Sequence, residues 1–138
     1  MKKLLVSLIF FIVLLTGCSL IEDVKDVTVG EISDWVNTHI IDNGINEIKN
    51  YINNNDNIDI NQTIDKLKNS MTKLEEYNLD IQNIDNQEIK ETWDKLYNEM
   101  KKQYETIQNN KDNPNNITDF DTSLLEKYQK EFEELIKK

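Results

Sequence analysis

The chain has 138 residues, with 16 Lys and no Arg, 26 Asp plus Glu, one His and one Cys, and its formal charge is −10. That length suffices for one domain of ordinary size and excludes a second large one. The acidic balance argues against nucleic acid as a partner, because binding to phosphates requires an excess of cationic side chains. A single Cys excludes an intramolecular disulfide and any cysteine-rich metal site.

Residues 1–17 show the order of charge and hydrophobicity that is typical of an export signal. Met1-Lys2-Lys3 is a cationic start, and the apolar stretch 4–15 that follows is interrupted only by Ser7. As a helix this stretch would span about 18 Å, which is too short for the ~30 Å hydrocarbon core of a bilayer. The sequence therefore predicts a cleaved signal peptide rather than a membrane span. The alternatives are an ordinary secretory signal with a chance cysteine and a buried hydrophobic helix.

The apolar stretch ends in Leu15-Thr16-Gly17-Cys18, which resembles the lipobox of bacterial lipoproteins. The resemblance covers residues 1–18 and implies that a signal peptidase cuts between Gly17 and Cys18, after diacylglycerol is attached to the Cys18 sulfur. A small residue before the cut suits a protease subsite, and a cysteine thiolate is a nucleophile that accepts lipid. Two acyl chains, at ~0.8 kcal/mol per buried methylene, make a durable anchor. The resemblance predicts a protein held at the extracytoplasmic face of the cell membrane through Cys18.

The rest of the chain loosely resembles the small uncharacterised helical lipoproteins of Gram-positive bacteria. The resemblance rests on Ser19-Leu20 after the cysteine and on helices rich in Ile, Asn, Glu and Lys, and it implies no catalytic residues. Cleavage would remove Lys2 and Lys3 but no acid, which takes the formal charge from −10 to −12. Because an anionic membrane surface repels such a body, we expect lipid alone to hold it there.

We divide the chain into the signal peptide (1–17), a lipidated N-terminus with a short tether (18–30) and a helical domain (31–138). Residues 20–53 combine helical spacing with β-branched residues and with Gly30 and Gly44, each of which costs ~1 kcal/mol inside a helix. We therefore predict a helical region with breaks near Gly30 and between His39 and Gly44; a short strand at 27–29 is the alternative. The residues at helical spacing are Ile32, Trp35, Val36 and Ile40, then Ile41, Ile45, Ile48 and Ile52.

Three later stretches have apolar residues every three or four positions, which predicts amphipathic helices. Asp59, Asp85 and Asp121 are the expected N-caps, with Ile84 and Ile89 as a hydrophobic staple and Phe120 as another staple residue. The predicted linkers are 53–58, 78–84 and 109–118. The sequence thus predicts an all-α fold, a small antiparallel bundle of about four helices. Its core-facing residues are Ile60, Ile64, Leu67, Met71 and Leu74, extending toward Tyr77; Ile89, Trp93, Leu96, Met100, Tyr104 and Ile107; and Leu124, Leu125, Tyr128, Phe132, Leu135 and Ile136.

Residues suited to catalysis or metal binding are scarce. His39 is the single imidazole, so the chain cannot form a His-rich metal site or an HExxH helix, and a surface or capping role is expected for it. Two pairs of adjacent acids occur, Glu75-Glu76 and Glu133-Glu134, but the two side chains of each pair point in different directions on a helix. We therefore predict no enzyme activity, no cofactor and no metal.

Two surface features are also expected. Several acids precede a lysine by four positions, a spacing that supports exposed helices. Tyr51 and Tyr97 lie off or beside the apolar stripes, so an exposed pair of these rings would offer a partner-binding spot, whereas core packing is the alternative. The acid–lysine pairs are Glu91 with Lys95, Glu126 with Lys130, Glu133 with Lys137 and Glu134 with Lys138.

The sequence favours a membrane-anchored extracytoplasmic lipoprotein that acts as a protein–protein interaction module, with an envelope or extracellular protein as partner. One alternative is an accessory solute-binding lipoprotein, which is disfavoured because the chain left after cleavage is short for the usual two-lobed receptor. Another is a precursor whose residues 10–17 are released as a pheromone. This alternative resembles known sex-pheromone lipoproteins, although every lipoprotein signal ends in a similar apolar run.

Overall fold

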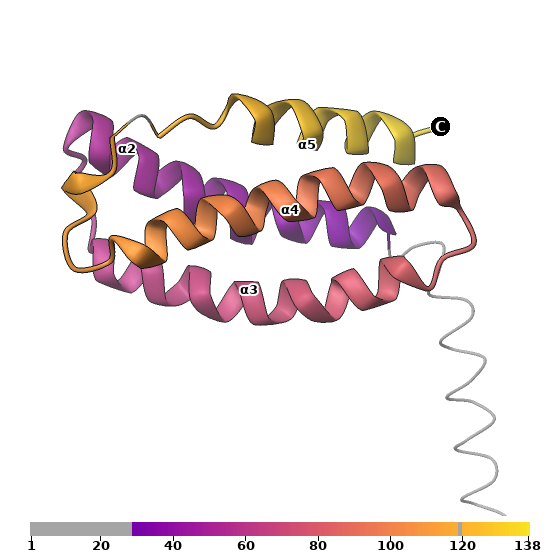
Figure 1. Cartoon of the computed structure of the whole chain (residues 1–138), viewed down its shortest axis with the longest axis horizontal. Helices are drawn as coiled ribbons and strands as arrows, with labels where there is room; N and C mark the ends of the chain where they lie inside the picture. Colours follow the sequence, from indigo (N-terminus) through magenta and orange to yellow (C-terminus); the bar gives the residue numbers. More distant parts are fainter. Residues whose placement is uncertain (1–28, 119) are drawn as a thin grey trace, which may run out of the picture.

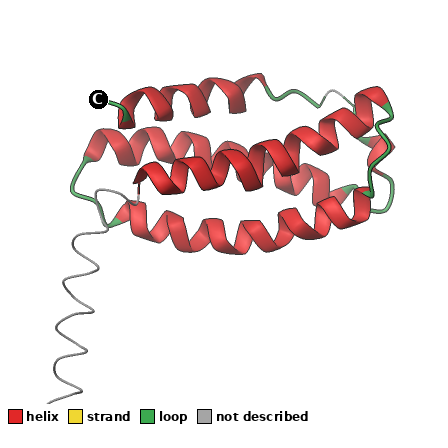
Figure 2. Ribbon diagram, turned by 180° about the vertical axis from the view of Figure 1, so that it is seen from behind, coloured by secondary structure: helices red, strands yellow, loops and turns green. Residues whose placement is uncertain are grey.

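The computed structural model describes residues 29–118 and 120–138, in which the regular elements are helices that pack together as a bundle (Figure 1). Viewed from behind, the same ranges show helices and loops and no strand (Figure 2). The all-α bundle predicted from the sequence is confirmed. The signal peptide and Cys18 lie outside the described residues, as does most of the alternative strand at 27–29, of which Val29 is helical.

Four helices form the bundle. The first helix runs without interruption over residues 29–54 and contains two named segments, the π-helix η1 (Asn37–Asn46) and α2 (Glu47–Asn54). It is followed by α3 (Ile60–Gln82), α4 (Gln87–Asn109) and α5 (Ser123–Ile136), with a 3-10 turn, η2 (Pro114–Asn116), in the last loop. Contacts join α3 to the first helix and to α4, and α4 to α5.

The predicted break between His39 and Gly44 is wrong, because the chain continues there as a π-helix. Gly44 is buried against α3, and a Cβ added to it would lie 2.9 Å from Leu67 Cδ1 and 3.2 Å from the His39 carbonyl oxygen. The glycine therefore allows a close approach of the first helix to α3, which offsets its low helix propensity. Gly30 itself is helical, whereas the residues before Val29, where the predicted break could also fall, lie outside the described residues.

The linker predicted at 78–84 begins too early, because α3 continues to Gln82. Two tertiary contacts hold the extra turn in the helix. Asn78 Oδ1 accepts a hydrogen bond from Trp93 Nε1 at 2.9 Å, and Ile81 is fully buried. Asn and Asp disfavour helix interiors locally, but burial and a partner on α4 override that preference.

The helix caps follow the predicted chemistry with shifts in position. Asp59 caps α3 as predicted, since its Oδ1 accepts a hydrogen bond from the Gln62 backbone N–H at 3.1 Å. For α4 the cap is Asn86 rather than Asp85, because Asn86 Oδ1 binds the Ile89 backbone N–H. For α5 the cap position belongs to Thr122, although the Asp121 carboxylate still accepts the Ser123 backbone N–H at 2.9 Å.

The core contains the predicted stripes of α3 and α4, centred on Trp93, whose ring lies 5.3 Å from that of Phe132 between centroids. The prediction for α5 is partly wrong. Leu125 and Phe132 are fully buried, but Leu124 is 42% exposed. Leu125 and Phe132 are seven residues apart and share one face, so the neighbouring Leu124 points away from it.

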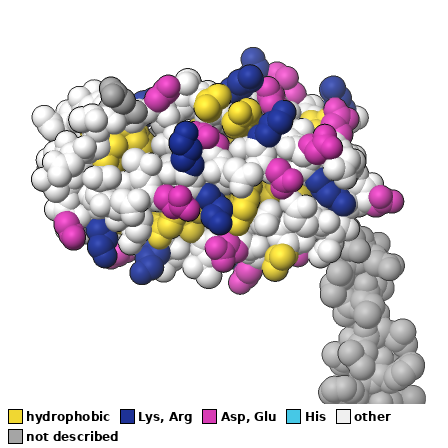
Figure 3. Space-filling view, viewed as in Figure 1, with side chains coloured by type: hydrophobic (Ala, Val, Ile, Leu, Met, Phe, Trp, Pro, Cys, Tyr) yellow, Lys and Arg dark blue, Asp and Glu magenta, His cyan; other side chains and the backbone are white. Residues whose placement is uncertain are grey.

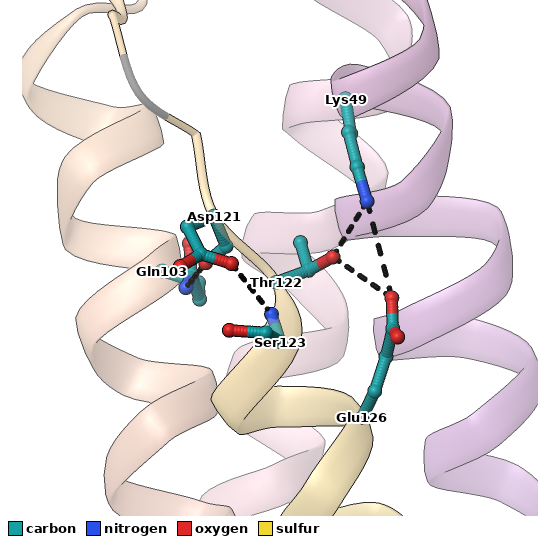
Figure 4. Close-up of polar contacts among 6 residues, drawn as sticks. All are labelled: Lys49, Gln103, Asp121, Thr122, Ser123 and Glu126. Carbon is teal, nitrogen blue, oxygen red and sulfur yellow. Dashed lines mark hydrogen bonds and ion pairs between the residues drawn. The ribbon is translucent and has the colours of Figure 1, made fainter.

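The loop between α4 and α5 is fixed to the bundle by buried apolar and polar contacts. Gln103, itself buried, donates hydrogen bonds to Glu99 Oε1 (3.1 Å) and to the Asp121 carbonyl oxygen (2.8 Å). Lys49 Nζ donates to Thr122 Oγ1 at 2.7 Å (Figure 4). These bonds join α2, α4 and the start of α5, while the loop residues Pro114, Ile117 and Phe120 are buried.

The ion pairs of the described residues do not coincide with the predicted acid–lysine pairs. Lys49 Nζ lies 3.9 Å from Glu126 Oε1, and this ion pair, drawn in Figure 4, connects α2 to α5. The other two pairs are local, Lys73 with Glu76 on α3 and Lys130 with Glu134 on α5. Both local pairs are exposed and contribute little to stability.

Candidate functional site

One face of the bundle carries mixed charge. Figure 3 shows the side formed by α3, α4 and α5, where lysines and acids are interspersed and hydrophobic side chains appear in small separate areas. This face resembles an ordinary solvated protein surface. The candidate sites therefore lie elsewhere, in two hollows of the bundle.

The first candidate site, which we call the aromatic groove, lies between the first helix and α3 and consists of a cluster of rings and a polar cleft that meet at His39. The rings of Trp35 and His39 are 5.0 Å apart between centroids, and Tyr77 meets Trp35 edge-on at 5.2 Å. Lys73 Nζ lies 4.9 Å from the centroid of the Tyr77 ring, a cation–π geometry. Trp35 and Tyr77 are half-buried against the core and His39 is exposed, so the three rings form a supported surface cluster.

The groove continues from His39 into a polar cleft of about 370 Å³. Asn43 and Glu47 follow His39 at four-residue intervals on the first helix, while Lys66, Asn69 and Ser70 face them from α3. Glu47 Oε2 accepts a hydrogen bond from Thr63 Oγ1 at 3.3 Å, which occupies one of its oxygens. The aromatic groove thus has rings at one end and neutral and charged hydrogen-bonding groups at the other.

The second hollow, which we call the end groove, lies at the end of the bundle where the described chain begins. It has a volume of about 800 Å³ and is formed by the start of the first helix, the loop between α3 and α4, and the end of α5. Its wall combines apolar and polar residues, and the polar ones include Asn86, Glu88 and Lys138. The apolar lining consists of Val29, Ile84, Ile89, Leu135 and Ile136.

Shifted pKa values occur at three described groups, Lys73, Asp121 and Tyr104, which belong to different parts of the fold. A hydrogen bond from Lys73 to Glu76 raises the pKa of the lysine, and the charge of Glu76 adds to this effect. The backbone N–H of Ser123 lowers the pKa of Asp121, and burial raises the pKa of Tyr104. Each shift has a structural explanation, in the ion pair, the start of α5 and the core respectively.

The predicted site residues have different outcomes. Gly17 and Cys18 lie outside the described residues, so lipidation stays a prediction. His39 is on the surface as predicted. Tyr51 and Tyr97 do not form an exposed pair: both are half-buried, and Tyr97 packs on the core with its ring 6.2 Å from that of Trp93.

The cluster of Trp35, His39 and Tyr77 is not predicted from the sequence. A signal for part of it was present, because Trp35 and His39 are four residues apart and so share a helix face. The position of Tyr77 next to them depends on how α3 packs against the first helix, which no local spacing reveals. Metal binding has no support in residues 29–118 and 120–138, where no group of three or more His, Cys, Asp and Glu side chains converges.

Among the described residues, no helix combines the length and the hydrophobicity that crossing a bilayer requires. Comparison of the chain with protein-family models, curated proteins and solved structures finds no match.

Proposed function

We propose that the protein is a membrane-anchored extracytoplasmic lipoprotein whose helical bundle is a protein–protein interaction module. The motif Leu15-Thr16-Gly17-Cys18 after a short apolar stretch supports the anchor. We further propose that the protein has no enzymatic activity and no cofactor, since a single imidazole and dispersed acids do not suit general acid–base work. Hydrolysis of peptidoglycan, ester or phosphate substrates by the pure protein would contradict this part.

The observation that carries the interaction role is the aromatic groove. Trp and Tyr are enriched where proteins bind each other, because their rings bury a large area with few rotatable bonds. Here Trp35 is held between His39 and Tyr77, so its ring is already ordered before a partner arrives. The polar cleft beside it supplies amides and charges that suit the hydrogen-bonding rim of an interface. The expected partner is an envelope or extracellular protein that inserts a segment between the first helix and α3.

The test is chemical crosslinking and purification of the lipidated protein from its own membranes. We expect a partner in constant ratio with the wild type and its loss with Trp35→Ala or Tyr77→Ala, since truncating an interface anchor costs about 2 kcal/mol or more. Leu79→Ala is the matched control, because Leu79 is 65% exposed but lies two residues from Tyr77 on another side of α3. A partner retained equally by all variants would exclude the aromatic groove, and no constant partner would contradict the interaction role.

A further inference from the structure

We propose that the end groove is the docking site of residues 19–28 of this same chain, which fold back on the bundle directly after the lipid attachment site. The inference extends the proposed function, on which it depends for a mature chain that begins at Cys18. Its consequence is that the lipid anchor and the bundle are held at a short, defined separation rather than by a free tether.

The lining of the end groove is incompletely covered. Ile84, Ile89 and Ile136 come from three different parts of the fold, and each is only half-buried although it packs against the core. They surround a hollow of about 800 Å³ whose wall also includes Val29 and Gly30. A Cβ added to Gly30 would meet nothing within 4 Å, so the space beside the first helix is open. An apolar segment seated there would remove these side chains from water.

The occupant is indicated by where the described chain begins. Val29 is part of the groove wall, so the residues that precede it emerge at the groove itself. At up to ~3.3 Å per residue, Val24 lies within about 17 Å of Val29. A segment tethered this closely has an effective concentration on the order of millimolar, which favours it over a free molecule.

Residues 19–28 carry apolar side chains that an apolar surface would remove from water. Leu20, Ile21, Val24 and Val27 recur at helical spacing. A straight continuation of the first helix would place Val24 about 140° around the axis from Val29, at 100° per residue. Val29, Ile32 and Val36 face the core, so Leu20, Val24 and Val27 would then lie on other sides of the helix, about 140–180° around the axis from Val29. Docking of residues 19–28 in the end groove covers both unpartnered apolar surfaces at once.

The experiment uses disulfide formation in the lipidated protein within its native membranes. Lipid blocks the Cys18 sulfur, so an introduced pair supplies the free thiols. Val24→Cys is combined with Ile136→Cys, and Asp23→Cys with Ile136→Cys is the control of equal reach but different side-chain direction. We expect at least about tenfold more intramolecular disulfide in the Val24 pair, because a seated segment presents one face to the groove. Val24→Cys with Ile89→Cys repeats the test from α4.

The results distinguish residues 19–28 from a second copy of the chain as the occupant of the end groove. Equal yields from Val24 and Asp23 would mean that the segment passes the groove without seating, and would overturn the proposal. Disulfides between two molecules would assign the groove to a second copy instead. Intact mass, read on the same samples, reports lipid on Cys18, so a failure of the anchor prediction is distinguishable from a failure of docking. A thermal melt of Ile136→Cys by circular dichroism establishes that the variant folds.

Discussion

The indole Nε1 of Trp93 donates a hydrogen bond to Asn78 Oδ1 at 2.9 Å, which joins α4 to the last turns of α3. The Trp93 ring is fully buried, so this N–H has to find its partner within the protein. One contact therefore explains both why α3 extends beyond its expected end and how a polar atom is accommodated in the core.

The Trp93–Asn78 pair gives a first prediction. Trp93→Ala should lower the free energy of unfolding by about 3–5 kcal/mol, because it removes the largest fully buried side chain. Asn78→Ala should cost about 1–3 kcal/mol by leaving the indole N–H unpaired. Urea denaturation followed by circular dichroism measures both. Asn50→Ala, at an exposed position of α2, is the control and should change stability by less than about 0.5 kcal/mol.

Two glycines of the first helix should respond to alanine with opposite signs. Gly44→Ala places a Cβ 2.9 Å from Leu67 Cδ1, so we expect a loss of about 1–3 kcal/mol through overpacking. Gly30→Ala meets no atom within 4 Å and should gain up to about 1 kcal/mol from helix propensity. Thermal melts of the two variants test this. A stabilising Gly44→Ala would mean that the first helix is not pressed against α3.

The carboxylate of Asp121 should make a pH-dependent contribution to stability. Its pKa is lowered in the folded state by the Ser123 backbone N–H, so the contribution is present above the ordinary value of 3.8 and is lost as pH falls through the lowered value. Asp121→Asn keeps an acceptor oxygen but does not titrate. Denaturation curves from pH 7 to pH 2 should show the wild type more stable than Asp121→Asn at neutral pH, with the difference shrinking in acid. A difference independent of pH would refute this origin of the shift.

Cys18→Ala should block both lipid transfer and the specialised cleavage. An unprocessed precursor, or a form released by another peptidase, is the expected product. Detergent phase partitioning and intact mass provide the measurement: wild type should enter the detergent phase, begin at Cys18 and carry added lipid mass. A wild-type protein from its native host that begins at Met1, or that keeps a free Cys18 thiol, would refute the lipoprotein hypothesis.

Local patterns in the sequence predicted the helices and their buried stripes because each depends on neighbours within the same helix. Leu67, Leu74, Leu96 and Met100 are all buried as their spacing indicates. The cap of α3 at Asp59 was equally local. These local patterns agree with the folded structure because the helix faces that they mark as apolar are the faces that pack together in the bundle.

The errors arose where contacts between helices outweigh local preference. The low helix propensity of glycine predicts a break before Gly44, but its missing side chain makes room for Leu67 of another helix. Local preference places Asn78 in a linker, but its amide oxygen accepts a hydrogen bond from Trp93. The cluster around Trp35 was missed for the same reason, because Tyr77 reaches it only through helix packing.

The end groove has a practical consequence for labelling this molecule. Val29 and Lys138 both line it, whereas the loop 55–59 and the turn η2 lie toward the far end of the bundle (Figure 1). If residues 19–28 dock in the end groove and Cys18 carries lipid, as proposed, a fluorescent or affinity tag fused after Lys138 would lie at the anchored end of the bundle. A tag inserted into the exposed loop 55–57 would lie at the opposite end of the bundle, where the proposed extracytoplasmic location predicts that an antibody reaches it on intact cells.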